Sequence, residues 1–195
     1  MNHIIFSPVR RVITTIFLLI GILFLNAQSY TLDNTTSFLQ VDGTSSLHDW
    51  HVDAEKQSGY IEFSDFDKVA INSIKLSVES ESLKSGKSGM DKNTYKALKT
   101  KSFKNIDFNL IMVESIAKVS EGIYNVKGKG KMLICGVSQI IPLDFELIIK
   151  DKVISIIGKN TILMTDYGIK PPTALLGTIK TGNEIVITHK TVFKQ

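Results

Sequence analysis

Apolar and polar residues alternate one by one through most of this 195-residue chain. The clearest example is 141–150, IPLDFELIIK, in which residues 141, 143, 145, 147 and 149 are apolar. Because successive side chains of a strand point to opposite faces, this pattern predicts strands with one buried face. Similar patterns favour strands at 30–41, 50–56, 59–64, 74–79, 106–112, 122–135, 153–163 and 185–193. We therefore expect an all-β protein with about eight strands.

Only one segment has the spacing of a helix. Over 90–99, MDKNTYKALK, Met90, Thr94, Tyr95 and Leu98 fall on one stripe. Eight antiparallel strands in one domain need a sandwich or a closed barrel to satisfy their edges. The long strands and the single helix favour an eight-stranded antiparallel barrel, which is wide enough to be filled by side chains or to hold one small ligand.

The first 27 residues are expected to be a secretory signal rather than part of the fold. Arg10 and Arg11 precede an apolar run of 14 residues, 12–25, and Ala27 offers a cleavage point. An uncleaved membrane anchor is the alternative. The prediction is a signal peptide at 1–27, one domain at 28–195, and a periplasmic or secreted protein.

Loss of that signal changes the charge balance. Both arginines lie within it, so residues 28–195 hold 21 lysines, 19 acidic residues and no arginine. Arginine is the residue best suited to read phosphates and guanine edges, so we expect no nucleic-acid partner. Cys135 is the only cysteine, which excludes an intrachain disulfide and a multi-cysteine metal site. We expect no cofactor and no metal.

Two glycines occupy the apolar face of the strand expected at 122–135. Lys127, Lys129 and Lys131 form the polar face, so Gly128 and Gly130 point inward. Glycine inside a strand is unfavourable unless something approaches closely. The two glycines leave room either for an apolar ligand or for a sharp bend or a bulky neighbouring side chain.

The segment 43–51, GTSSLHDWH, contains the residue types of a hydrolase. A catalytic triad needs its serine, histidine and aspartate brought together in space, with the nucleophile on a strained turn. Ser45, His48 and Asp49 are crowded into one short stretch, and no G-x-S-x-G motif is present. We therefore favour a structural role, in which Trp50 packs and His48 forms a hydrogen bond near a barrel mouth.

Lysines dominate the stretch 84–104. Seven lysines face a single acid, Asp91, across the expected helix and its flanking loops. Such a cluster is suited to phosphate groups or to an anionic membrane surface. The alternative is a solvated helix face.

Four segments together resemble the YceI-like family of secreted polyisoprenoid-binding proteins. They are GTSSLHDW (43–50), MDKNTYKALKTKSFKNIDF (90–108), GKGKMLICGVSQIIPLDFEL (128–147) and LMTDYGIKPPTALLGTIKTGNEIVI (163–187). The resemblance implies an extended, lipocalin-like antiparallel barrel and no catalysis. It also implies an interior that binds a long isoprenoid chain, an isoprenoid quinone or another amphipathic lipid, and a homodimer. The missing arginines leave only lysines or backbone N–H groups to meet a phosphate head group.

The inward-facing positions supply the expected site, in which burial of an apolar chain drives binding. The interior candidates are Phe108, Leu110, Met112, Tyr124, Val126, Gly128, Gly130, Met132, Leu143, Phe145, Leu147, Ile185 and Ile187. For the mouth or head-group region the candidates are His48, Trp50, Met90, Tyr95, Met164, Lys92 and Lys96. Two other functions stay open at this point. One is a structural protein with a solid barrel, and the other is a hydrolase using the Ser45/His48/Asp49 region.

Overall fold

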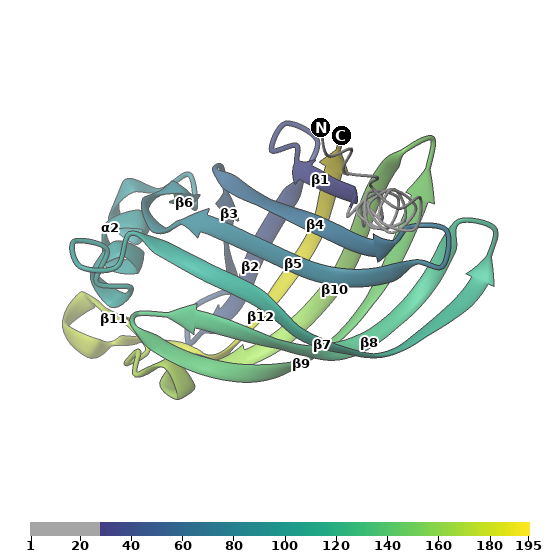
Figure 1. Ribbon diagram of the computed structural model, residues 1–195. Coiled ribbons are helices and arrows are strands. Elements are labelled where there is room, and N and C mark those ends of the chain that lie inside the picture. Colours follow the sequence, from purple (N-terminus) through teal and green to yellow (C-terminus); the bar gives the residue numbers. More distant parts are fainter. Residues whose placement is uncertain (1–27) are drawn as a thin grey trace, which may run out of the picture.

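Eight antiparallel strands close into a barrel, as the alternation predicts (Figure 1). The computed structural model describes residues 28–195, apart from the side chains of 174 and 175. The ring follows the order β1–β4–β5–β7–β8–β9–β10–β12, and β12 pairs back onto β1. Its strands are β1 (Gln28–Leu32), β4 (Gln57–Asp65), β5 (Ala70–Glu79), β7 (Asn105–Ser120), β8 (Ile123–Ile134), β9 (Val137–Lys150), β10 (Val153–Leu163) and β12 (Ile179–Lys194).

Three shorter strands lengthen one side of the barrel. β2 (Phe38–Ser45), β3 (Trp50–Ala54) and β6 (Leu83–Lys84) follow one another from β12. Each continues the line of a ring strand. For example, β2 continues β1 because both pair with β12, and β3 continues β4 because β3 pairs with β2 while β4 pairs with β1. The wall therefore consists of eight long strands, three of which are interrupted at the same level.

We call this shared level the seam, and it comprises residues 33–37, 55–56 and 80–82. Other hydrogen bonds there replace those of the interrupted strand ladder. The Asn34 side chain donates to the carbonyl of Glu55 at 2.8 Å and accepts from the N–H of Gln57 at 2.7 Å. The N–H of Glu55 donates to the carbonyl of Ser82 at 3.0 Å. One amide side chain thus satisfies two backbone groups that an uninterrupted strand would pair itself.

Replacing Asn34 by alanine is expected to lower the free energy of unfolding by about 1–2 kcal/mol. The reason is that two backbone groups at the seam lose their partner. Asn34→Asp keeps the acceptor for Gln57 but loses the donor to Glu55, so its loss should be smaller. Urea unfolding of the three proteins checks this order, and an alanine variant as stable as wild type would contradict it.

The seam corrects one expectation from the sequence. A single strand was predicted over 30–41, but a turn at 33–37 separates β1 from β2. The Asp33 carboxylate accepts from the N–H of Thr35 at 2.9 Å, and the Asp33 carbonyl accepts from the N–H of Ser37 at 3.1 Å. These local bonds compete with the strand ladder, as aspartate and serine commonly do.

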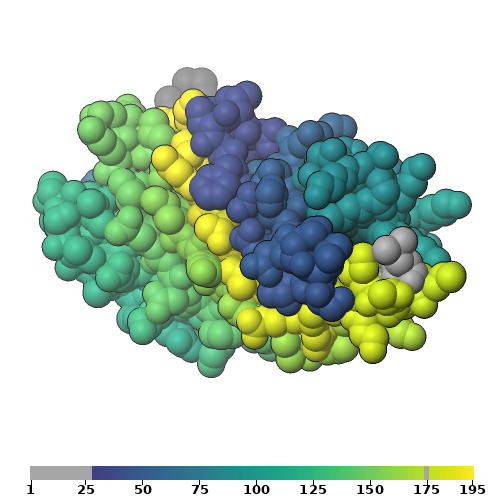
Figure 2. Space-filling model, turned by 180° about the vertical axis from the view of Figure 1, so that it is seen from behind, coloured from purple at the N-terminus to yellow at the C-terminus, as the bar shows by residue number. Residues whose placement is uncertain are grey.

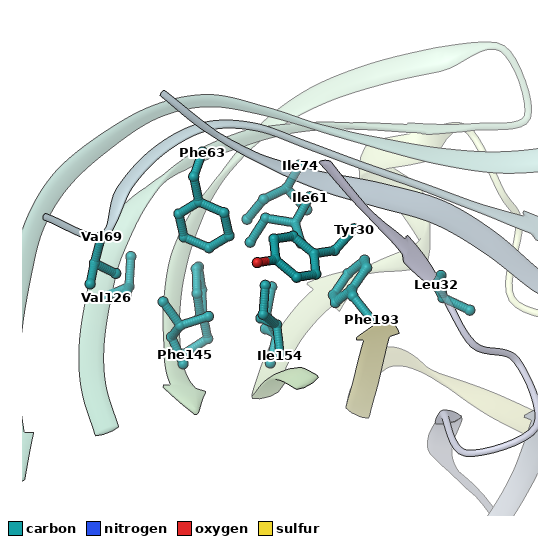
Figure 3. Close-up of a cluster of buried hydrophobic side chains, with 12 residues drawn as sticks. Tyr30, Leu32, Ile61, Phe63, Val69, Ile74, Val126, Phe145, Ile154 and Phe193 are labelled. Carbon is teal, nitrogen blue, oxygen red and sulfur yellow. The ribbon is translucent and has the colours of Figure 1, made fainter. Parts of the chain in front are cut away.

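The largest core fills one end of the barrel, which we call the closed end. Figure 3 shows Tyr30 with its ring among Phe63, Phe193 and Ile154. The rings of Tyr30 and Phe63 meet edge to face, with centroids 6.1 Å apart. The buried members of this core are Tyr30, Leu32, Ile61, Phe63, Val69, Ile74, Val126, Phe145, Leu147, Ile154, Ile156 and Phe193.

The opposite end carries the helix and the irregular segments. Within residues 28–195 the one α-helix is α2 (Ser88–Ala97), which begins two residues before the predicted span. It lies beside β6, at the end of the barrel where β11 (Thr173–Ala174) is also found (Figure 1). The described part of the chain also has three 3-10 turns, η2 (Ser80–Ser82), η3 (Met164–Tyr167) and η4 (Leu175–Gly177). Among residues 28–195, no helix is long and apolar enough to cross a membrane.

Candidate functional site: an apolar cavity in the open end of the barrel

The half of the barrel away from the closed end is hollow. It holds a cavity of about 470 Å³, within the usual range of small-molecule sites. Ile74, Phe145 and Ile156 belong to the closed-end core and also line the cavity, so they form its floor. A barrel filled by side chains throughout is therefore not what the structure shows.

The cavity reaches the surface between three segments, and we call this opening the mouth. These are the β2–β3 turn with Leu47 and His48, the start of α2 with Lys87 and Met90, and the loop before β12 with Pro172. Leu47 is 66% exposed, which places it at the outer rim. Figure 2 shows the blue, teal and yellow-green segments of these regions gathered at one end of the molecule.

The cavity is long as well as apolar. Its lining on β12 runs from Ile179 to His189, which corresponds to about 25 Å of strand once the irregular pairing between Thr181 and Ile185 is allowed for. Inward and outward side chains alternate from Ile185 to His189, whereas the pairing with β2 is irregular between Thr181 and Ile185. A ligand that follows the strand would be an elongated molecule.

Six of the predicted interior residues line the cavity. They are Phe108, Met132, Leu143, Phe145, Ile185 and Ile187. Five of them lie on β8, β9 and β12, and Phe108 lies on β7 ahead of the position where the alternation of that strand is interrupted. What the pattern could not show is which part of each strand faces empty space.

Four other candidates point inward but pack within the closed-end core. Val126 and Leu147 are fully buried there, and Leu110 and Tyr124 pack against it. Their strands, β7, β8 and β9, pass through both halves of the barrel. The same strand therefore supplies cavity wall at one end and solid core at the other.

The prediction that Met112 points inward is wrong. Leu110 pairs with Gly130 and Val113 with Gly128, so Ile111 and Met112 together oppose Lys129. This is a β-bulge, which inserts one extra residue and reverses the alternation beyond it. Ile111 and Met112 are 50% and 48% exposed on the outer face.

Gly128 and Gly130 face inward, but they do not leave room for a ligand. A Cβ atom at Gly130 would lie 2.1 Å from the Phe108 ring. A Cβ atom at Gly128 would lie 2.4 Å from the carbonyl oxygen of Met112, next to the bulge. The Phe108 ring fills the space at Gly130, and the backbone of β7 fills the space at Gly128. This matches the interpretation in which neighbouring groups, and not a ligand, require the two glycines.

Four mouth candidates line the cavity, and three do not. His48, Trp50, Met90 and Met164 contribute to its wall. Tyr95 instead turns its hydroxyl to the carbonyls of Glu81, at 2.9 Å, and Leu83, at 3.2 Å. Lys92 and Lys96 are exposed on α2.

The Ser45/His48/Asp49 region is a hydrogen-bonded turn. The Ser45 hydroxyl donates to the carbonyl of His48 at 2.7 Å and accepts from the N–H groups of Leu47 and His48. The His48 ring nitrogen Nδ1 lies 2.7 Å from the Asp49 carbonyl, and Trp50 donates to the carbonyl of Thr44 at 2.9 Å. The serine and histidine side chains are therefore engaged with backbone groups and not with each other, as expected for the structural role.

The predicted site omits several polar residues of the lining, at 107, 160 and 181 among others, and it also omits His189. His189 lies on the inward face of β12 next to the floor, and burial lowers its pKa to about 4. Its place in the alternation, two residues after Ile187, was the available signal. Among residues 28–195, no three histidine, cysteine or acidic side chains are grouped as metal ligands would be.

Fold and cavity together define a closed eight-stranded barrel with one solid end and one hollow, apolar end. The chain belongs to the YceI-like family, because the YceI-like domain model matches residues 30–193. This agrees with the resemblance seen in the sequence. No match was found among curated proteins.

Solved structures share this fold at low sequence identity. The crystal structure of Burkholderia cenocepacia BcnA has a TM-score of 0.65 at 17% identity, covering 83% of this chain and 98% of that one. A polyisoprenoid binding domain from Saccharophagus degradans, implicated in plant cell wall breakdown, has a TM-score of 0.63 at 14% identity, covering 85% and 97%. The Campylobacter jejuni YCEI protein has a TM-score of 0.55 at 17% identity, covering 72% and 82%.

Proposed function

We propose that this protein binds a long-chain amphipathic lipid, such as a polyisoprenoid or an isoprenoid quinone, and carries or sequesters it without catalysis. The observation that carries the proposal is the elongated apolar cavity of about 470 Å³, open at the mouth. Removing apolar ligand surface from water contributes about 25 cal/mol per Å². A periplasmic or secreted location and cleavage of a signal at 1–27 belong to the same proposal, although 1–27 lie outside the described residues.

The similar structures support a binding role over an enzymatic one. The Saccharophagus degradans protein is a polyisoprenoid binding domain that covers most of this chain. The wall of the cavity here is built from aliphatic and aromatic side chains of the same barrel. Its few polar residues are dispersed, and the Ser45 and His48 side chains are held by backbone groups.

The direct test is to express residues 28–195, purify the protein without detergent and compare native with denatured mass spectra. We expect an additional mass of several hundred daltons in the native spectrum, which organic extraction removes. A protein that carries no such mass and also takes up neither farnesol nor a short-chain ubiquinone would overturn the proposal. The same native spectra test the homodimer expected from the family resemblance.

Filling the cavity is expected to abolish uptake. Ile187→Trp projects a large ring from β12 into the cavity, so affinity for an apolar fluorescent probe should fall at least about tenfold. Val186→Trp is the matched control, because Val186 lies one residue away on the opposite face of β12, paired with Asp42 and Thr161. Equal affinities of the two variants in a fluorescence titration would contradict a ligand inside the barrel.

We also propose that the mouth contacts an anionic membrane when lipid is exchanged. Lys87, Lys92 and Lys96 are exposed on or next to α2, and Leu47 and Leu176 expose apolar side chains near the mouth, with Leu176 fully exposed. A lysine close to an anionic bilayer contributes about 1 kcal/mol, and salt screens this attraction. The arrangement combines charge attraction with apolar side chains that could enter the interface.

Reversing two charges at the mouth is expected to weaken membrane binding. The double variant Lys92→Glu/Lys96→Glu should bind vesicles of phosphatidylglycerol and phosphatidylcholine at least about tenfold less tightly at low salt. The control is Lys127→Glu/Lys129→Glu, the same charge change on the outer face of β8, where the lysines pair with Asp144 and Glu114. Vesicle co-sedimentation measures both, and equal losses would show that only net charge matters.

A further inference from the structure

The floor of the cavity carries one polar side chain that the proposed function leaves unused. His189 on β12 pairs with Gly158 on β10, and the next inward residues toward the mouth are Ile187 and Ile185. A Cβ atom at Gly158 would lie 2.7 Å from the His189 Nε2. The glycine therefore leaves room for the His189 ring next to β10 and Phe145, at the innermost part of the cavity lining on β12.

One nitrogen of the His189 ring has a hydrogen-bonding partner among the described residues, and the other has none. Nδ1 lies 3.4 Å from the hydroxyl of Thr191, which is itself buried. Among the described residues, none forms a hydrogen bond with Nε2. A neutral imidazole has one donor and one acceptor nitrogen, and the Thr191 hydroxyl can complement Nδ1 in either form. Nε2 therefore offers one hydrogen bond to whatever fills the floor.

The surroundings select an uncharged partner. The floor residues Ile74, Phe145 and Ile156 are apolar, and burial keeps the His189 ring neutral at physiological pH by lowering its pKa to about 4. The lysine that lines the cavity, Lys87, precedes α2 at the mouth. The carboxylate of Asp107 already accepts a hydrogen bond from Ser77 at 2.7 Å. A charged group at the floor would lose its hydration without meeting a counter-charge.

We propose that His189 forms a polar subsite at the floor, which hydrogen-bonds one neutral hydroxyl or carbonyl group at the leading end of an otherwise apolar ligand. The proposal rests on the proposed function, because it places the ligand in the same cavity. It defines the ligand further, as a molecule that enters with a neutral oxygen first. A hydroxyl fits both forms of the imidazole, whereas a carbonyl fits only the form with hydrogen on Nε2.

The test is a thermodynamic cycle between a side chain and a ligand oxygen. Farnesol and farnesene share a skeleton but differ in the hydroxyl, and each competes with an apolar fluorescent probe for wild type and for His189→Leu. The ratio of the two dissociation constants is compared between proteins, so that the different solubilities of the ligands cancel. We expect the relative preference for farnesol to be about 3- to 10-fold greater in wild type. His189→Gln, which keeps a hydrogen-bonding group, should retain part of the preference.

Thr188 provides the matched control. It is the neighbour of His189 on β12 but lies on the opposite face, where it pairs with Lys159 and Gln40, and it does not line the cavity. Thr188→Leu should therefore leave the ratio unchanged. A ratio that changes as much in Thr188→Leu as in His189→Leu would overturn the subsite.

The outcomes separate the subsite from the proposed function. If both ligands displace the probe and His189→Leu leaves the ratio unchanged, lipid binding stands and the floor subsite is wrong. If neither ligand displaces the probe from wild type, the proposed function itself fails for these lipids. As a second measurement that needs no variant, the ¹⁵N resonance of the His189 Nε2 should shift with farnesol and stay in place with farnesene. A resonance that responds equally to both ligands contradicts the hydrogen bond.

Discussion

Phe193→Ala is expected to lower the free energy of unfolding by about 3–5 kcal/mol, the usual cost of removing a buried phenylalanine. Phe193 is 0% exposed and lies in the closed-end core beside Tyr30 and Ile154 (Figure 3). It also sits where β12 pairs with β1 and closes the ring, since Leu32 pairs with Phe193. The substitution therefore leaves a void at the place where the barrel closes.

The contrasting variant is Ile187→Ala on the same strand. Ile187 lines the cavity and is only half-buried, so its truncation removes fewer contacts and should cost about 1 kcal/mol. Urea unfolding of both variants measures the difference. Folded Phe193→Ala should still bind an apolar probe with wild-type affinity, because the cavity lies in the other half. Equal destabilisation by the two variants would contradict the division into a solid and a hollow half.

Acidification is the second change with a large expected effect. Burial lowers the pKa of His189 from 6.5 to about 4, so the unfolded chain binds this proton more tightly than the folded chain. The contribution of the neutral His189 to the free energy of unfolding is therefore fully present above pH 6.5. It is lost progressively as the pH falls toward 4. Each unit of pKa difference between the folded and unfolded chain corresponds to about 1.36 kcal/mol, so the loss at pH 4 amounts to about 3 kcal/mol.

The check is urea unfolding at several pH values for wild type and His189→Leu. The wild-type free energy of unfolding should fall more steeply between pH 6.5 and pH 4 than that of the variant. Asp33 acts in a different window, because hydrogen bonds from Lys194 and Thr35 lower its pKa below the usual value. Its contribution is lost only when the pH falls below about 4. Parallel curves for the two proteins from pH 6.5 to pH 4 would show that His189 titrates normally.

The barrel could be predicted from the sequence because a period of two is a local property of each strand. The segment 141–150, for example, lies in β9 with Phe145 and Leu147 inside. Local patterns failed where the chain departs from the period without a visible signal. The bulge at Ile111 and Met112 arises from pairing with β8, and the turn at 33–37 interrupts an alternation that continues on both sides.

The site was harder to predict, because inward residues look alike whether they face a core or a cavity. Leu143 lines the cavity while Leu147, four residues later on the same strand, is fully buried at the closed end. The difference depends on which side chains from other strands meet at that level. The large rings of Tyr30, Phe63 and Phe193 come together from β1, β4 and β12 only in the folded barrel.

The pairing of β1 with β12 also determines how the protein can be held. Thr31 lies opposite Lys194, so the carboxyl terminus and the first described strand lie together beside the closed end, away from α2 and the mouth (Figure 1). A sensor surface, bead or fused domain attached after Gln195 would hold the barrel by its solid half. The opening would then face the solution, so the proposed ligand could still enter and leave the immobilised protein.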